Sequence, residues 1–222
     1  MFLARPANQP LDSIPSEVKD KAMRTLLWFG IVSIVMLFGG LTSAYLVRQG
    51  EGKWVDFALP ELFQISSIVI ILSSVAIQWS LFSVRKNNVT SLKIGLLLTL
   101  FLGSAFVICQ YYAWSELYRN GIVFTGQISD IKTDFQYIPS GKETATEAGQ
   151  VGNVAGSFLY VLTGLHVAHL LAGLIALIIV FSRAILGKYS VVNYNGVRLC
   201  TIYWHFLGGL WLYLFFFLLY IR

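Results

Sequence analysis

The chain has 222 residues, of which 56% are hydrophobic and only 12% are charged, and its mean hydropathy is +0.69. Soluble domains carry charge on roughly a quarter of their residues, so this composition excludes an ordinary soluble domain and predicts an integral membrane protein. The net charge of +5 does not indicate nucleic-acid binding, because the basic residues are spread over short polar segments and form no basic run.

The first 21 residues are polar, and we expect them to form a cytoplasmic N-terminal segment. The first apolar run follows this segment. It is longer than the core of a cleaved signal peptide, which has roughly 7–15 residues. We therefore expect the first membrane span itself to direct insertion.

Five apolar stretches are long enough to cross a bilayer, which takes about 20 residues per helix. We expect residues 22–222 to form a single all-α domain, an integral membrane bundle of five transmembrane helices. Only one connection, about 118–152, is long, and its glycine, threonine and acidic residues indicate a loop on the outer surface. The predicted spans run over about 22–47, 60–84, 91–117, 153–186 and 197–221.

The charges of the connecting segments predict the orientation of the bundle. The side that carries the N-terminal segment has ten basic and three acidic residues, whereas the other side has six basic and eight acidic residues. Basic residues concentrate on the cytoplasmic side of membrane proteins. We therefore expect a cytoplasmic N-terminus and a periplasmic C-terminus.

Small residues recur along the first two spans and predict close helix packing. Ser66, Ser73 and Ser80 follow one another at intervals of seven residues in the second span. Small side chains let membrane helices approach closely, so this pattern indicates a compact bundle. A second group of small residues lies in the first span: Gly39, Gly40, Ser43 and Ala44.

The histidines are the first candidates for chemistry. His166 and His169 lie three residues apart in the fourth span, on one face of the expected helix, and His205 lies in the last span. An ionisable residue inside a membrane span is a functional-site hypothesis by default. The alternative is that His166 and His169 are neutral and hydrogen-bond a neighbouring helix, a lipid headgroup or a partner subunit.

Metal or haem binding by these residues is limited by their number. A dinuclear haem–copper centre with a second haem needs about six histidines, twice the number in this chain. One haem between His205 and His166 or His169 is conceivable. A di-iron bundle uses Glu-x-x-His pairs, and Glu116 has no histidine three residues later. The chain also has neither the internal repeat nor the broken helices typical of a secondary transporter.

Several motifs resemble one known family. TGLHVAHLLAGL (163–174) is similar to the TG-x-HG-x-HV-x-x-G signature of cytochrome oxidase subunit III, and YWHFLGGLWLYLF (203–215) resembles YWHFVDVVWLFLF in that family's last helix. SIVMLFGGLTSAY (33–45) resembles SEVMLF-x-x-x-x-AY, and Gln110 and Glu116 match a Q-x-x-E-x-x-E pattern. The resemblance covers all five helices in order and fits the short five-helix bacterial form.

The resemblance implies a non-catalytic subunit of an aerobic haem–copper cytochrome c oxidase in the bacterial inner membrane. Such a subunit stabilises the catalytic subunit, holds phospholipids and supports proton uptake and dioxygen access. Its expected partners are catalytic subunit I, subunit II, membrane phospholipids and a larger respiratory supercomplex, with no nucleic acid. Haems and coppers are expected in the partner subunits and no cofactor or metal in this chain. An accessory subunit of a quinol oxidase or nitric oxide reductase is the alternative.

Within this family, lipid binding or subunit packing is the role expected for seven residues, and no residue is expected to be catalytic. Arg198 is the candidate for a phosphate contact, because a guanidinium group forms paired hydrogen bonds with phosphate oxygens; it is equally a basic residue flanking a span. The seven residues are Trp79, Glu116, His166, His169, Arg198, Trp204 and His205.

The chain departs from the family pattern at four acidic positions. Residues Ile34, Ala113, Arg198 and Gly208 stand where the family carries an acid, and Glu116 alone persists. A buried carboxylate is costly unless it is paired. We therefore expect the polar network of these acids to be lost or rebuilt here, which argues against a proton-collecting role more than against lipid binding.

Overall fold

The computed structural model describes residues 15–50, 55–56, 59–120, 122, 124, 138–139, 154–191 and 193–221. Each of its long helices exceeds the roughly 20 residues needed to cross a bilayer, and each is apolar enough to do so. The described elements are α1 (Ser16–Gln49), β1 (Val55–Asp56), α2 (Leu62–Arg85), α3 (Val89–Arg119), β2 (Ile138–Pro139), α5 (Val154–Ile185) and α6 (Asn195–Tyr220). The prediction of an all-α bundle with five spans is thereby confirmed in the described part of the chain.

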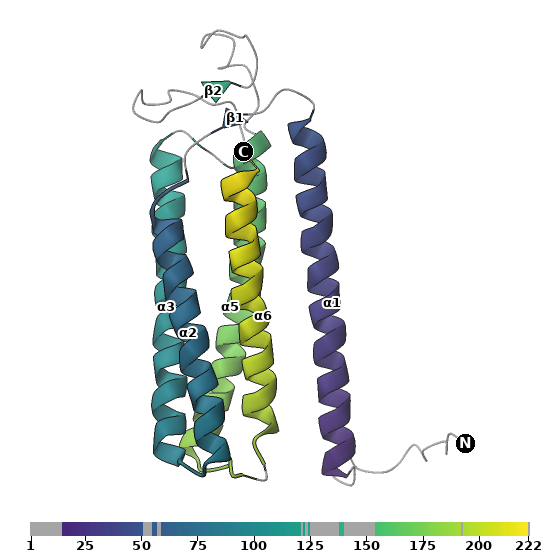
Figure 1. Cartoon of the computed structure of the whole chain (residues 1–222), viewed down its shortest axis with the longest axis vertical. Helices are drawn as coiled ribbons and strands as arrows, with labels where there is room; N and C mark the ends of the chain where they lie inside the picture. The colour runs from purple at the N-terminus through teal and green to yellow at the C-terminus, as the bar shows by residue number, and fades with distance from the viewer. Residues whose placement is uncertain are drawn as a thin grey trace, which may run out of the picture.

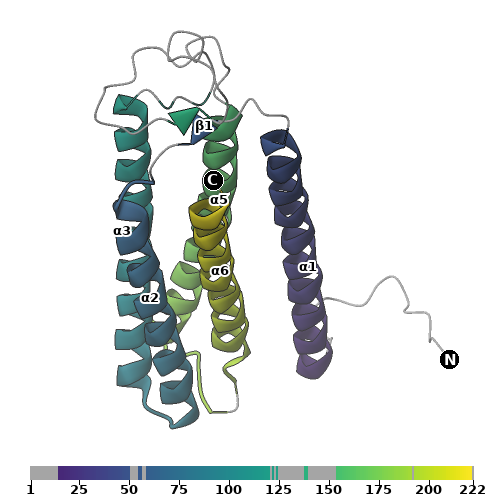
Figure 2. The same ribbon diagram turned by 45° about the horizontal axis from the view of Figure 1, so that its top comes forward.

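The five helices run roughly along one direction, and consecutive helices alternate in sense (Figure 1). α2 and α3 form an antiparallel pair, α3 packs against α5, and α6 packs against both α2 and α5. α1 lies at one edge of the bundle, where it contacts α5 and α6, and Figure 2 shows the same separation from α2 and α3. α1 starts at one end of the bundle and α6 finishes at the other, as expected for an odd number of spans.

The helix ends differ from the expected spans in informative places. α1 begins at Ser16, so residues 16–21, which were expected to belong to a polar segment, already form the first turns of this helix. The reason is that helix formation requires no apolar side chains, and the acidic Glu17 in the first turn favours a helix N-terminus.

The expected outer loop, about 118–152, lies mostly outside the described residues. Within the connections, the two-residue strands β1 and β2 pair antiparallel, with Val55 opposite Pro139 and Asp56 opposite Ile138.

Two short turns connect consecutive helices. Asn87 adopts a positive φ of 57° between α2 and α3, a conformation that asparagine tolerates better than most residues. The side chain of Asn88 then accepts a hydrogen bond from the backbone nitrogen of Ser91 at 3.1 Å and so caps α3. Between α5 and α6, Gly187 has φ +66°, which favours glycine.

Serines of α2 accept hydrogen bonds from α6 where the two helices pack together. Trp204 and Trp211 of α6, themselves seven residues apart, donate their indole N–H groups to Ser73 Oγ at 3.0 Å and to Ser67 Oγ at 2.9 Å. Each serine hydroxyl donates in turn to a carbonyl of its own helix. Buried polar groups need such partners, so the small-residue pattern of α2 both permits close packing and accepts the polar ends of large side chains.

α1 uses its small residues differently. Gly39, Gly40, Ser43 and Ala44 are exposed at the surface of the chain, and a Cβ on either glycine would meet no atom within 4 Å. Phe38 and Tyr45 instead form the buried face of α1. Tyr45 packs its ring at 5.1 Å from that of Phe217 on α6.

Candidate functional site: polar side chains of the bundle

His166 lies inside the bundle, at 0% exposure. Its ring lies 5.8 Å from the ring of Phe106 on α3 and 5.2 Å from that of Trp211 on α6. Neither ring nitrogen has a hydrogen-bond partner among the described residues. A fully enclosed ring has no surface to offer a lipid, so packing between α3, α5 and α6 is the role that this position fits.

His166 belongs to a buried polar layer. Gln110 of α3 donates from Nε2 to Ser66 Oγ at 3.0 Å, while its Oε1 has no partner among the described residues. Trp211 contacts His166 and also bonds Ser67, the neighbour of Ser66. The layer therefore ties α2, α3, α5 and α6 together at one level of the bundle.

His169 faces a different set of neighbours from His166. Its Nδ1 lies 2.7 Å from the carbonyl oxygen of Leu165 one turn earlier, and its ring meets Phe38 of α1 edge-on at 5.9 Å. Its backbone oxygen accepts a hydrogen bond from Tyr203 of α6 at 3.2 Å. The two histidines are thus neighbours in sequence that serve separate contacts, one at the bundle centre and one at the α1 edge.

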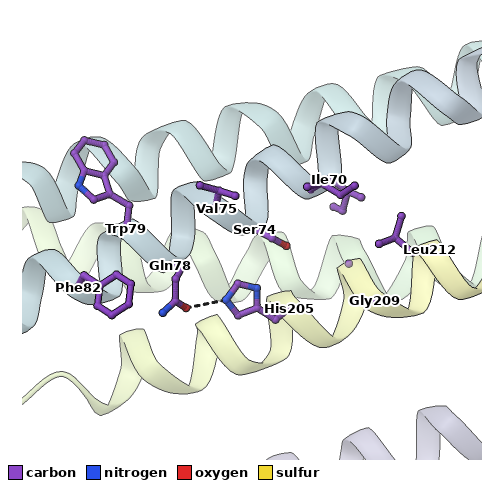
Figure 3. A pocket seen from close by; sticks show the side chains of 11 residues that line it. Ile70, Ser74, Val75, Gln78, Trp79, Phe82, His205, Gly209 and Leu212 are labelled. Carbon is purple, nitrogen blue, oxygen red and sulfur yellow. Dashed lines mark hydrogen bonds between the residues drawn. The ribbon is translucent and has the colours of Figure 1, made fainter.

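His205 lies at the surface, between α6 and α2. Its Nε2 lies 2.9 Å from Oε1 of Gln78. Gln78 and His205 point toward one another across a groove between the two helices (Figure 3). The groove has a volume of about 540 Å³ and is mainly apolar, and Trp79 lies along it.

Trp204 is part of the core, at 1% exposure. Besides its bond to Ser73, its ring fills the space over two glycines: a Cβ on Gly103 would lie 2.7 Å from the ring, and one on Gly173 would lie 3.6 Å from it. These contacts join the last helix to α2, α3 and α5.

The other two expected residues lie near helix ends. Glu116 is exposed near the end of α3, and Arg198 is half-buried in the first turns of α6. One turn before Arg198, the amide of Asn195 donates a hydrogen bond to the carboxylate of Asp20 on α1. The structure therefore does not gather the seven expected residues into one site; it distributes them over the core, the groove and two helix ends.

Within the described part of the chain, no three His, Cys, Asp or Glu residues lie close enough together to hold a metal ion. His166 and His205 also face different spaces, the first enclosed by α3, α5 and α6 and the second in the groove beside α2. What the arrangement provides is hydrogen bonding inside a bundle and one polar pair in an apolar groove.

Comparison with known proteins relates this helical bundle to one family. The family model described as "Cytochrome c oxidase subunit III" matches residues 117–222, the segment that contains α5, α6 and their histidines. Relatives with this name align over 82–89% of the chain. The C-terminal part of the chain matches the cytochrome c oxidase subunit III family, and relatives that align with most of the chain carry the same name.

Three relatives illustrate the match. The probable cytochrome c oxidase subunit 3 of Mycobacterium leprae is 28% identical over 89% of this chain and 86% of its own length. The subunit 3 of Corynebacterium diphtheriae is 26% identical over 82% of this chain and 79% of its own. The subunit 3 of Thermostichus vulcanus is 28% identical over 83% of this chain and 80% of its own length. The family match confirms the resemblance seen in the motifs.

Three of the four departures from the family's acidic pattern lie against neighbouring helices. Ala113 is fully buried, Ile34 packs on the core, and Gly208 is buried beside α2. A Cβ on Gly208 would lie 3.0 Å from Ser74 Oγ, which leaves little room for a carboxylate. The polar contacts at these levels are made instead by serines, indoles and Gln110.

Two features of the site escaped sequence reasoning. The bond between Gln78 and His205 joins residues 127 apart in the chain, and nothing in either span indicates it. The pairing of tryptophans with serines had a usable signal, because Trp204 and Trp211 are seven residues apart and their partners Ser67 and Ser73 are six apart. Polar groups at similar spacing on two spans, beside small residues, indicate faces along which the spans can pack.

Proposed function

We propose that this chain is the non-catalytic subunit III of an aerobic haem–copper cytochrome c oxidase, which stabilises the catalytic subunit in the bacterial inner membrane. The match to the subunit III family model and the alignment with 86% and 79% of the length of two relatives support this function. The expected partners are subunit I and subunit II, which would carry the haems and coppers, within a larger respiratory complex.

The observation that carries this proposal is how the bundle uses its polar and apolar groups. Apart from His166, the buried polar side chains of the described residues bond within the bundle, as with Gln110 and Ser66 or Trp204 and Ser73. Its outer faces are broad and apolar, above all on α1, which is the most exposed helix over its span. Such faces suit lipid tails and partner helices. On α1 the exposed apolar side chains include Leu26, Phe29, Val32, Val35, Met36 and Val47.

Phospholipid binding is the second part of the proposal. Arg198 is half-buried near the start of α6, on the predicted cytoplasmic side, where basic residues gather. Its guanidinium group suits a phosphate. A role in collecting protons is less well supported, because Ala113 and Gly208 occupy buried positions where the family pattern has acids. We therefore place structural support and lipid binding ahead of proton uptake.

Co-purification tests the proposal. Membranes containing the affinity-tagged chain are solubilised in mild detergent, and the chain is recovered beside an untagged control. We expect a haem–copper subunit in the eluate, with a haem α-band in the reduced-minus-oxidised spectrum. Recovery of the chain without any haem protein would contradict subunit membership. A haem spectrum from the chain freed of its partners would contradict the non-catalytic role.

A further inference from the structure

The α2–α6 groove carries the polar pair His205 and Gln78 at a depth that is unusual for hydrogen-bonding groups. His205 is ten residues beyond the start of α6 and Gln78 is seven residues before the end of α2. At 1.5 Å per residue, the pair lies about 10–15 Å from the nearest helix ends. The hydrocarbon core is about 30 Å thick, so the pair faces its interior rather than its surface.

The pair offers both a donor and an acceptor to a ligand. The Gln78 oxygen only accepts, so Nε2 of His205 carries the hydrogen between them, and Nδ1 of a neutral ring is then an acceptor. No hydrogen bond joins the amide nitrogen of Gln78 to any described residue, which leaves its N–H groups as donors. A ring carbonyl matches the amide N–H, and a ring hydroxyl matches Nδ1.

The walls of the groove select against a charged ligand. Apart from His205, none of its lining residues is ionisable. A phosphate at this depth would lack a counter-charge and would be costly. The volume of about 540 Å³ is in the range of sites for small organic ligands. The apolar lining includes Ile70, Ile71, Val75, Trp79, Phe82 and Leu212.

Glycines on α6 open the groove. Gly208 and Gly209 line it opposite α2, and a Cβ on Gly209 would meet no atom within 4 Å. Figure 3 shows Gly209 between His205 and Leu212 on the helix that faces α2. A ring of flat shape therefore has space beside the backbone of α6, next to the polar pair, with apolar side chains along the groove on both sides of the pair.

We propose that this groove binds the ring of an isoprenoid quinone or quinol, with the ring oxygen at Gln78 and His205 and the tail along the apolar wall. The chemistry of the site carries the assignment: an uncharged donor and acceptor at hydrocarbon depth, apolar walls and a volume suited to one small ring. It goes beyond the proposed oxidase function and does not depend on which donor supplies the oxidase with electrons.

Photolabelling tests this site. The assembly containing the full chain is placed in nanodiscs of phosphatidylcholine and phosphatidylglycerol and irradiated with an azido-benzoquinone that has a decyl tail. We expect saturable labelling within residues 70–82 or 205–212, competed by the unlabelled quinone. Absence of saturable labelling there would overturn the proposal. Equal competition by diacylglycerol or by added phosphatidylglycerol would assign the groove to an ordinary lipid instead.

Matched glycine variants separate binding from folding. Gly209→Leu fills the groove, whereas Gly40→Leu adds the same side chain to another exposed helical glycine with open space, on α1. We expect Gly209→Leu to abolish labelling and Gly40→Leu to leave it unchanged. Gln78→Leu should weaken binding about tenfold, the value of one hydrogen bond. Unchanged labelling in Gly209→Leu would overturn the proposal. Loss of a partner subunit from this variant, while the wild-type chain takes no label, would show that the groove receives a protein helix.

Discussion

Trp204 of α6 donates its indole N–H to the hydroxyl of Ser73 on α2 at 3.0 Å, and both side chains are buried, at 1% and 0% exposure. The two residues are 131 positions apart in the chain. The contact joins the last helix to the second, and the same ring closes over Gly103 of α3. The ring also covers Gly173 of α5, so one side chain links four of the five described helices.

Replacing Trp204 by phenylalanine removes this hydrogen bond and keeps most of the ring. We expect the free energy of unfolding to fall by about 1 kcal/mol, because the Ser73 hydroxyl loses the group that it accepts from. Denaturant or thermal unfolding of the solubilised protein measures the change. Trp28, 54% exposed on α1, provides the control, and Trp28→Phe should shift stability by less than about 0.5 kcal/mol. Equal effects would contradict the role given to Trp204.

The approach of α2 and α3 depends on Gly95. A Cβ at this position would lie 2.3 Å from Ser80 Oγ and 3.1 Å from the backbone oxygen of Ala76. Gly95→Ala should therefore force the helices apart and cost about 1–3 kcal/mol. Gly40→Ala, in open space on α1, should be neutral or slightly stabilising, since alanine favours helix. If both variants unfold at the same midpoint, the close packing of α2 and α3 is not limiting.

His166 should be replaceable by an apolar residue of similar size. Its two ring nitrogens have no partner among the described residues, so their burial is a cost that His166→Leu removes. We expect an unfolding free energy that is unchanged or higher by up to about 1 kcal/mol. Phe106→Ala, beside the same ring, should lose about 3–5 kcal/mol and shows that the assay detects core damage. A loss of similar size in His166→Leu would indicate a bound partner for the ring.

Tyr189, between α5 and α6, gives the chain a stability that depends on pH. Burial raises the pKa of its hydroxyl above the ordinary value of 10.0, against a smaller opposing effect of Arg183. The unfolded phenol therefore ionises first as the pH rises. The stability that the neutral phenol of Tyr189 contributes is fully present below its unfolded-state pKa of about 10. It is lost as the pH rises through the pKa of the folded state.

Tyr189→Phe should remove this pH dependence. We expect the stability difference between the wild-type protein and the variant to shrink as the pH is raised from 9 to above 10, measured by chemical unfolding at each pH. The hydroxyl also limits the neighbouring turn, because a Cβ on Gly196 would lie 2.6 Å from it. A constant difference across this pH range would show that the phenol ionises equally in both states.

The histidine motif illustrates how far sequence reasoning reached. The spacing of His166 and His169 predicts that they share a helix face, and the helix is present. The two rings nevertheless have different neighbours, because this face of α5 contacts more than one helix. Phe106 and Trp211 enclose the ring of His166, and Phe38 of α1 contacts the ring of His169. Which neighbour each ring meets depends on how the helices are rotated, and local sequence does not specify rotation.

The sequence by itself determined the class of protein, the five spans and the resemblance to one family, because these follow from hydropathy and local motifs. Only the tertiary structure decided that α1 stands at the bundle edge with its small residues exposed, and that α6 supplies indoles to the serines of α2. It also decided that Gln78 and His205 meet in a groove. In a bilayer every helix satisfies its own backbone, so spans are set locally. Their partners are chosen by side-chain fit between distant segments.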